Sequence, residues 1–508
     1  MATIKQTLRL HPSDNIYVAL VNLKQGILLP ETNLVVNQSV PRGHKIAAVN
    51  IKKDEFVIRY GNVIGQATID IIAGDHIHSH NLGMSEHSQN NIIKTKPASA
   101  VTTDITKRTF MGYQRRDGKV GTRNYIGILT SVNCAGSVAK FIAEAAIKDD
   151  FLKNYPNIDG IVPIVHSTGC GMSGEGEGYS TLKRTISGYA QNPNFGGILL
   201  VGLGCEVLQV DAIVKGVSHM LDNPFRHMTI QAEGGTRKSI ERGLEELKQI
   251  AMIANEFKRV PSPISEITIG MQCGGSDGYS GITANPALGV ASDLLVQHGG
   301  TSILSETSEV YGAEHLLTDR AITQGVANKL MSRITWWEDY CARNGGEMDN
   351  NPSPGNKRGG LTTILEKSLG AVAKSGSAPL SEVYLYAEFI NTKGFVFMDS
   401  PGYDPCSSTG QIASGANMIV FTTGRGSVSG YKPVPCIKLA TNTEMYERMT
   451  EDMDINCGDI VSEGVSVETK GHEIFEKIIR IASGELSKSE ELGFGGVEFV
   501  PWQIGAVM

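Results

Sequence analysis

The chain has 508 residues, of which 41% are hydrophobic and 19% charged, and its formal net charge is -7. This length exceeds one ordinary hydrophobic core, so we expect two or three globular domains. The acidic balance and the lack of a dense Lys/Arg run argue against nucleic acid and membrane surfaces as partners. We find no N-terminal signal peptide, in which a basic segment precedes an apolar run, and no window of roughly 18 apolar residues that would form a membrane helix. We therefore expect a cytoplasmic protein.

Glycine is in excess, with 58 of 508 residues or about 11%, against roughly 7% in average proteins. Because prolines number only 19, this excess favours many tight loops over disorder. The eight cysteines are scattered and include no Cys-x-x-Cys pair, which favours reduced thiols over a disulfide framework. Any metal site must therefore be assembled from segments that are far apart in the sequence.

Residues 1–84 are expected to form a small all-β module, because short β-type runs alternate with turn residues. The strands expected in this module are 16–20, 45–50, 56–60 and 64–72. Residues 85–108 are polar and have neither helical nor strand periodicity, so we interpret them as a linker.

From about residue 109 the sequence changes to short apolar runs, each followed by a glycine-containing loop and a helical stretch. This pattern is typical of βα units and predicts α/β domains with parallel sheets, over 109–262 and 263–508. The expected strands are 125–130, 161–165, 197–201, 267–271, 302–304 and 418–422, with helices at 137–147 and 286–298. Residues 335–360 are polar and are predicted to be irregular, including a Pro/Gly-rich loop over 351–360.

Ligands of parallel α/β sheets bind beyond the carboxyl ends of the strands. The side chains expected in such loops are Cys134, His166, Cys170, Cys205, Glu206, Cys273, Asp277, Glu306 and Glu309. Residues 202–206 resemble the start of a dinucleotide-binding loop, but Gly-x-Gly-x-x-Gly is not completed, which weakens a nicotinamide-cofactor interpretation. For each cysteine, a buried structural thiol is the competing interpretation.

Four histidines lie in two short stretches of the β module: His44, His76, His78 and His80. In an extended strand the last three share one face, because side chains alternate with period two. Imidazole is a common metal ligand. We therefore predict that His76 and His78, with His44, bind metal or substrate, against the alternative of ordinary surface histidines.

Three further segments offer positive charge. Arg123 and Asn124 follow an Asp-Gly turn, Asn356 and Lys357 lie in the Pro/Gly-rich loop, and Arg425 stands between two glycines after an apolar run. Arginine binds carboxylates bidentately. We predict that these residues bind an anionic substrate; solvated turn and loop residues are the alternative.

Together these segments resemble the altronate/galactarate dehydratase family. The residues that carry the resemblance are 42–45, 74–81, 117–124, 202–206, 273–277, 281–286, 351–357, 366–370 and 422–426. The resemblance spans nearly the whole chain and implies that the β module is an SAF (β-clip) domain. It also implies a hydro-lyase that acts on a hexonate or hexarate with a divalent metal, Fe(II) or, as second choice, Mn(II). Residues 76–81 and 401–405 are more similar to the altronate branch.

Such an enzyme must remove a proton beside a carboxylate and expel hydroxide from the next carbon. We expect His166 or Glu306 to act as base, and Ser276 and Asp277 to contact substrate or metal. Two metal assignments compete: Fe(II) on the histidines of the β module, or an iron–sulfur cluster on the post-strand cysteines, for which the candidates are Cys170, Cys205 and Cys273.

We expect a homodimer that binds a small anionic sugar acid, with D-altronate as its substrate. Galactarate or another aldarate and a sulfo-lyase reaction of the sulfolactate type are the enzymatic alternatives. A non-catalytic sugar-acid binding protein is the alternative from another class, and the density of acid, base and thiol groups in the loops argues against it.

Overall fold

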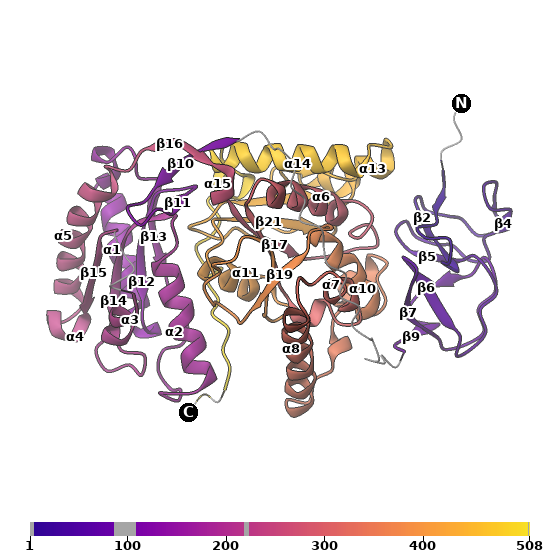
Figure 1. Ribbon diagram of the computed structural model, residues 1–508, viewed down its shortest axis with the longest axis horizontal. Helices are drawn as coiled ribbons and strands as arrows, with labels where there is room; N and C mark the ends of the chain where they lie inside the picture. Colours follow the sequence, from indigo (N-terminus) through magenta and orange to yellow (C-terminus); the bar gives the residue numbers. More distant parts are fainter. Residues whose placement is uncertain (1–4, 86–107, 218–222, 506, 508) are drawn as a thin grey trace.

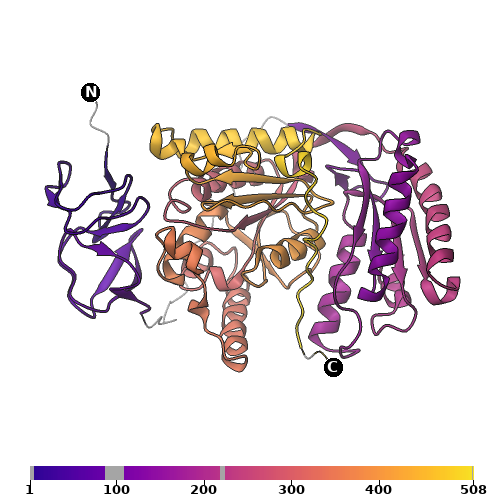
Figure 2. The same ribbon diagram turned by 180° about the vertical axis from the view of Figure 1, so that it is seen from behind.

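The computed structural model describes residues 5–85, 108–217, 223–505 and 507. The N-terminal module, the C-terminal domain and the second domain lie in a row, with the C-terminal domain in the middle (Figures 1 and 2). The predicted fold class is confirmed: a small antiparallel β module precedes a large α/β region with parallel sheets. Most of the predicted linker falls outside the described residues. No helix in the described ranges is both long enough and apolar enough to cross a membrane.

The N-terminal module consists of short antiparallel strands in three small sheets. The first sheet contains β1 (Thr7–Leu8), β2 (Ile16–Ala19), β5 (Lys45–Ala47) and β8 (His76–Ile77). The other two contain β3 (Leu28–Leu29) with β4 (Leu34–Val35), and β6 (Phe56–Arg59) with β7 (Asn62–Ala67) and β9 (Leu82–Gly83). The four predicted strands of the module correspond to β2, β5, β6 and β7, each of which is shorter than predicted.

The second domain is built on a four-stranded parallel sheet with the order β13-β12-β14-β15. These strands are β12 (Tyr125–Thr130), β13 (Gly160–Ile164), β14 (Phe195–Gly202) and β15 (Phe225–Thr229). All residues of β12 and β14 are buried, as expected for strands that are covered on both faces. The helices are α1 (Gly136–Lys148), α2 (Glu177–Ala190), α3 (Val210–Val217), α4 (Ile230–Glu233) and α5 (Thr236–Ala254).

A three-stranded antiparallel sheet connects the second and C-terminal domains. It contains β10 (Thr109–Gln114), β11 (Val120–Gly121) and β16 (Arg259–Pro263). Strand β16 ends at the predicted domain boundary of 262 and 263. The sheet contacts the C-terminal domain through Arg259, which donates to the Ala482 carbonyl at 3.0 Å, and through the amide of Met111, which donates to Ser483 Oγ at 3.1 Å.

The C-terminal domain contains a seven-stranded parallel sheet with the order β19-β20-β18-β17-β21-β22-β23. The strands are β17 (Thr268–Cys273), β18 (Thr301–Leu304), β19 (Leu380–Tyr384), β20 (Gly394–Met398), β21 (Met418–Thr423), β22 (Cys436–Ala440) and β23 (Ile455–Asn456). Strands β17, β18 and β21 are neighbours in the middle of the sheet, so the loops that follow them meet at one edge.

The helices of this domain are α6 (Ala284–Gln297), α7 (His315–Thr318), α8 (Gln324–Arg343), α9 (Pro354–Arg358), α10 (Ile364–Val372), α11 (Asp404–Ala413), α12 (Thr443–Arg448), α13 (Asp459–Ser462), α14 (Val467–Ala482) and α15 (Lys488–Glu491). The prediction of an irregular segment over 335–360 was wrong in two places. Helix α8 continues to Arg343 because its buried face, with Ile334 and Trp337, outweighs the polar residues around it. Helix α9 forms because Ser353 and Asn356 make a capping box around Pro354.

The N-terminal module packs against the C-terminal domain through buried polar contacts as well as apolar ones. Val57 and Ile64 of the module share one hydrophobic cluster with Leu369 of α10. Lys45 Nζ lies 2.9 Å from the Glu366 carboxylate, and Arg59 also binds this carboxylate; all three side chains are fully buried. The module is therefore fixed on the C-terminal domain by an ion-pair network without solvent access.

Candidate active site

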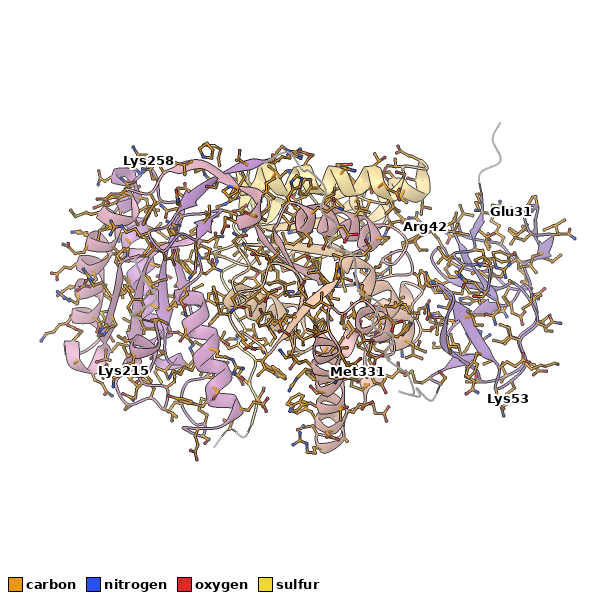
Figure 3. The ribbon with its side chains drawn as sticks, viewed as in Figure 1. Glu31, Arg42, Lys53, Lys215, Lys258 and Met331 are labelled. Carbon is orange, nitrogen blue, oxygen red and sulfur yellow. The ribbon has the colours of Figure 1, made fainter. Side chains whose placement is uncertain are left out.

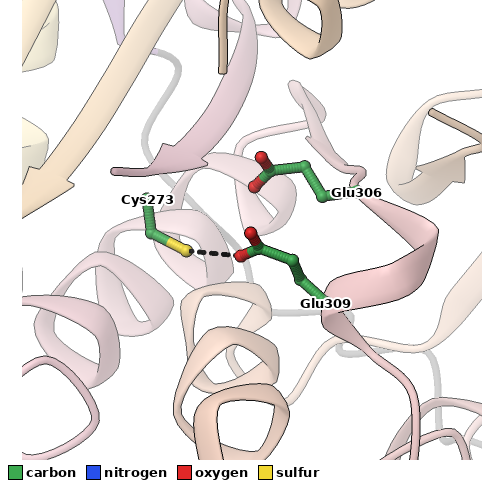
Figure 4. Close-up of side chains that lie close together, drawn as sticks. All are labelled: Cys273, Glu306 and Glu309. Atoms are coloured by element: carbon green, nitrogen blue, oxygen red, sulfur yellow. Dashed lines mark hydrogen bonds between the residues drawn. The ribbon is translucent and has the colours of Figure 1, made fainter. Parts of the chain in front are cut away.

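Three buried side chains meet at the carboxyl edge of the C-terminal sheet. Cys273 is the last residue of β17, while Glu306 and Glu309 follow β18 (Figure 4). The Cys273 thiol lies 3.6 Å from Glu309 Oε2, and one ligand atom from each of the three residues lies within 4.8 Å of the others. We refer to Cys273, Glu306 and Glu309 as the Cys-Glu-Glu group.

Glu306 is held in an unusual state. Its φ of 70° lies in the left-handed region, which residues other than glycine adopt only at a cost in conformational free energy. Its side chain is buried, yet neither carboxylate oxygen has a hydrogen-bond partner among the described residues. Burial, with the negative charges of Glu309 and Asp404, raises the pKa of Glu306 well above its usual value. Such an unsatisfied carboxylate is expected where a ligand supplies the missing partner.

Two lysines and an aspartate complete the surroundings. Lys367 of α10 donates to Glu309 at 2.5 Å, and Lys374 Nζ lies 3.8 Å from Glu306. Asp404 begins α11 and is only partly buried. Burial and the nearby Glu309 raise the pKa of Asp404 to about 6. Asp404 is therefore the acid of this cluster whose pKa lies near neutrality.

The Cys-Glu-Glu group fits a divalent metal ion. Burial raises the pKa of the Cys273 thiol to about 12, and metal coordination removes such a proton. With the thiol deprotonated, the four acidic groups carry four negative charges, which the two lysines and one divalent ion balance. The orphaned oxygens of Glu306 supply free lone pairs, and one sulfur with carboxylate oxygens suits Fe(II) or Mn(II) better than Mg²⁺ or Ca²⁺.

The predicted histidines do gather, although only His76 lies in a strand. His44 Nδ1 lies 3.0 Å from His76 Nε2, and the ring centroids of His44 and His78 are 5.0 Å apart. His44 Nε2 and His78 Nε2 lie 3.2 and 2.8 Å from the backbone carbonyls of Arg358 and Lys357. The two rings thus bind the carboxyl end of α9, where carbonyl groups lack helical partners.

The three cysteines predicted to hold metal separate into two domains. Cys170 and Cys205 are exposed in the second domain, whereas Cys273 is buried in the C-terminal domain. Over the described ranges, no other group of three or more His, Cys, Asp or Glu residues has ligand atoms that all lie within 4.8 Å of one another. Cys170 and Cys205 therefore do not join Cys273 around one ion.

His166 also lies in the second domain. Its Nε2 donates to the Thr130 carbonyl at 3.0 Å, and its Nδ1 accepts from the Thr168 amide at 3.3 Å. Burial lowers the pKa of His166 to about 4, so the ring is neutral. Both ring nitrogens have backbone partners, which accounts for the orientation of the ring without a substrate.

Ser276, Asp277 and Asn356 lie together where the C-terminal domain contacts the N-terminal module. Asp277 accepts hydrogen bonds from Thr441 Oγ1 at 2.9 Å and from Asn442 Nδ2 at 3.1 Å. Asn356 Nδ2 donates to the Ser276 carbonyl at 2.8 Å, while its Oδ1 caps α9. These side chains hold the loop after Cys273 in place.

Arg123 binds a carboxylate bidentately, as we predicted for a substrate, but this carboxylate belongs to Glu490. The two N–O distances are 2.6 and 2.8 Å, and the remaining donors bind backbone carbonyls. Asn124 donates to the Asn157 and Ala254 carbonyls. Both side chains have protein partners within the folded chain.

Arg425 lines a cavity of about 250 Å³ between the N-terminal module and the C-terminal domain. Three more arginines line the same cavity, and its other polar side chains include Asp277, Asn442 and Glu444; the arginines are Arg42, Arg358 and Arg448. Arg42 extends from the module towards the C-terminal domain (Figure 3). Lys357 is half-buried beside Arg358 and is not among the residues that line the cavity. We call this cavity the arginine pocket.

The sequence reasoning gave no role to Glu309, Lys367, Lys374 or Asp404. A signal was available for Lys367, because it lies with Glu366 in a helix whose nine residues are all buried. Charged residues in so apolar a stretch are retained only when they are paired. Asp404 has no such signal, since it meets the cluster only through the fold.

A buried group of acids, thiol and lysines at the carboxyl edge of a parallel sheet defines an α/β enzyme with a polar, metal-compatible centre. Sequence models of one family match nearly the whole chain in three parts. They are the altronate/galactarate dehydratase SAF domain over 5–85, the D-galactarate dehydratase/altronate hydrolase second domain over 112–255, and the D-galactarate/altronate dehydratase C-terminal domain over 264–507.

Relatives that match over nearly their full length belong to the same family as these sequence models. The chain is 34% identical over 493 residues to altronate dehydratase of Bacillus subtilis, covering 97% of this chain and 98% of the relative. It is 38% identical over 491 residues to galactarate dehydratase (L-threo-forming) of Escherichia coli, covering 94% and 93%. It is also 29% identical over 393 residues to the (2R)-sulfolactate sulfo-lyase subunit beta of Chromohalobacter salexigens, covering 77% and 96%. The chain belongs to the altronate/galactarate dehydratase family and is a carbon–oxygen hydro-lyase.

Proposed function

We propose that the chain removes water from a six-carbon sugar acid, D-altronate, to give a 2-keto-3-deoxy acid. The observation that carries the proposal is the Cys-Glu-Glu group beside two lysines, in a chain whose relatives include altronate and galactarate dehydratases. Galactarate is the alternative substrate. We further propose a homodimer in the cytoplasm, and light scattering tests the oligomeric state.

The reaction removes the proton on the carbon next to the carboxylate and expels hydroxide from the following carbon, and the resulting enol tautomerises to the ketone. A divalent ion held by Cys273, Glu306 and Glu309 would supply Lewis-acid stabilisation of the carboxylate and of the departing oxygen. Lys367 and Lys374 place two ammonium groups beside the same point, where they stabilise the negative charge that develops on the substrate.

We assign proton transfer to Asp404. Its pKa of about 6 suits proton exchange near neutral pH. The predictions that Glu306 or His166 is the base stay predictions. Glu306 would use the same two carboxylate oxygens to bind a metal ion and to accept a proton, so these two roles compete.

The arginine pocket is proposed to bind the anionic substrate through Arg425. The Arg425 amide donates to the Gly275 carbonyl at 2.9 Å, so this residue lies against the loop that begins at Cys273. A cavity of about 250 Å³ is slightly smaller than the usual ligand pocket of roughly 300 to 1,000 Å³, which suits a small molecule. Because Cys273, Glu306 and Glu309 are buried, the residues that cover them must move for substrate to reach them.

The test is to assay D-altronate, galactarate and (2R)-sulfolactate side by side with the metal-loaded enzyme. We expect release of a 2-keto acid from altronate, with galactarate slower. Sulfite release from sulfolactate without dehydration of either sugar acid would assign the chain to the sulfo-lyase reaction instead. Binding of the sugar acids without product would support the non-catalytic alternative.

A further inference from the structure

Three cysteines lie at one edge of the second-domain sheet. Cys134, Cys170 and Cys205 are the exposed free cysteines of the described chain; the other five are buried or half-buried. Each of the three follows one of the adjacent strands β12, β13 and β14. Because these strands are parallel, their carboxyl ends bring all three loops to the same edge.

The loops are tied together next to the cysteines. The amide of Asn133 donates to the carbonyl of Thr168 at 2.9 Å, which joins the Cys134 and Cys170 loops. The amide of Val207 donates to the carbonyl of Gly169 at 3.1 Å, which joins the Cys170 and Cys205 loops. Each of these four residues is one or two positions from a cysteine, so the backbone segments that carry the three cysteines lie side by side.

The spacing of the thiols is wider than a single ion requires. A tetrahedral zinc ion binds sulfur at about 2.3 Å, which places its sulfur ligands about 3.8 Å apart. Within the described ranges, the three Sγ atoms do not all lie within 4.8 Å of one another. An iron–sulfur cluster suits wider spacing, because each cysteine binds a different iron atom.

Glycine backbone beside the cysteines favours an anionic cluster. Gly169, Gly171 and Gly204 have φ values of 100°, 65° and 128°. At Gly169 a Cβ would lie 2.3 Å from the Ser131 carbonyl, so only glycine permits this approach of the loops. Such left-handed turns expose successive amide groups, a geometry that recurs around phosphates and iron–sulfur clusters.

Space is available at the same edge. A cavity of about 410 Å³ is lined by Gly136, His166 and Asn133, the residue that precedes Cys134. A second, of about 60 Å³, is lined by Cys170 and Gly171.

We propose that the second domain binds a [4Fe–4S] cluster through Cys134, Cys170 and Cys205. Three thiols lose their protons as three iron–sulfur bonds form, and iron(II), iron(III) and sulfide supply the cluster. No thiol of this domain is left for the fourth iron in the described residues, so that iron keeps a position for water or another oxygen ligand. The cluster is separate from the Cys-Glu-Glu group and does not depend on which sugar acid is the substrate.

The test is anaerobic reconstitution of the full chain with iron and sulfide, followed by measurement of bound iron, acid-labile sulfide and visible absorbance. We expect about four sulfides per chain, as in a [4Fe–4S] cluster. The variants Cys134→Ser, Cys170→Ser and Cys205→Ser should each lose most of the sulfide and the absorbance. Their melting curves should match that of the parent protein without a cluster, since the replaced side chains are exposed.

Cys341→Ser is the matched control, because Cys341 is a partly exposed cysteine on α8, away from this edge. It should keep the full sulfide content. Cys273→Ser should also keep it, which separates the cluster from the metal proposed in the C-terminal domain. A parent protein without labile sulfide, a single bound zinc ion at these thiols, or three serine variants that retain the cluster would each overturn the proposal.

Discussion

Lys45 of the N-terminal module and Glu366 of α10 form an ion pair with an N–O distance of 2.9 Å, and both side chains are fully buried. Arg59 binds the same carboxylate, as do the amide and hydroxyl of Thr362. The opposite charges hold the pKa of Glu366 at about 2, although burial alone would raise it. The carboxylate therefore remains ionised over the whole physiological range, whereas burial lowers the pKa of Lys45 to about 8.

Glu366→Gln should destabilise docking of the module by about 3 to 5 kcal/mol, because it leaves two buried cations without their anion. Lys45→Met should cost less, since Arg59 still neutralises Glu366. Urea unfolding, with limited proteolysis to detect release of the module, measures both. Lys52→Ala removes the exposed pair with Asp70 and serves as control. Equal effects of Glu366→Gln and Lys52→Ala would contradict the buried network.

Glu306→Gln keeps the shape of the side chain but removes its charge. If Glu306 is a metal ligand, the affinity for Fe(II) should fall more than about 100-fold, because even outer partners of ligands contribute 10 to 100-fold. Metal titration and turnover are measured on the same sample. Normal metal content with abolished turnover would instead assign Glu306 the role of base alone.

Arg425→Gln should raise KM for the sugar acid about 10 to 100-fold, the contribution of one or two hydrogen bonds to a charged group. The effect on kcat should be smaller, because Arg425 lies in the arginine pocket and not in the Cys-Glu-Glu group. Arg343→Gln, at the exposed end of α8, is the control. An unchanged KM would remove the arginine pocket from substrate binding.

Arg123→Lys tests whether Arg123 serves the fold or the substrate. Lysine cannot reproduce the bidentate contact with Glu490 and the further backbone contacts, so stability should fall by about 3 kcal/mol. We expect KM to stay the same in the folded fraction. A raised KM with unchanged stability would support the sequence prediction that Arg123 binds substrate.

His166 should make stability depend on pH. Its pKa in the folded chain is about 4, below the ordinary 6.5, so protons bind the unfolded chain more strongly. The stabilisation is complete above pH 6.5 and decreases as the pH falls towards about 4. Relative to His166→Gln, the parent should lose about 2 kcal/mol between pH 7 and pH 5. Urea midpoints at both pH values measure this, and turnover of the variant tests the predicted role as base.

Local sequence patterns predicted the elements whose residues are uniformly apolar. The strand expected at 125–130 is β12, because all six residues are buried between two helical layers. Helix α8 was missed in part, because a helix with one buried face and a polar remainder resembles a loop once glycine and asparagine follow it.

The candidate site was only partly predictable for a different reason. Cys273 ends strand β17 and Glu306 follows β18, so strand prediction alone places both at the carboxyl edge of the sheet. Lys367 and Asp404 reach the same point from α10 and α11, and only the order of the strands in the sheet brings those helices there. The spacing of residues along the chain does not contain that order.

The segment after α15 runs back from the C-terminal domain onto the second domain, where Phe499 packs against Tyr189 with ring centroids 4.5 Å apart. Trp502 and Gln503 line the small cavity with Cys170. About 240 residues separate Ala254, the end of α5, from Gly496. At the usual rate of synthesis the ribosome needs on the order of 10 to 50 s to deliver them. The second domain is thus complete well before the segment that borders Cys170, so the cysteine edge can take up iron and sulfide before the rest of the chain has been made.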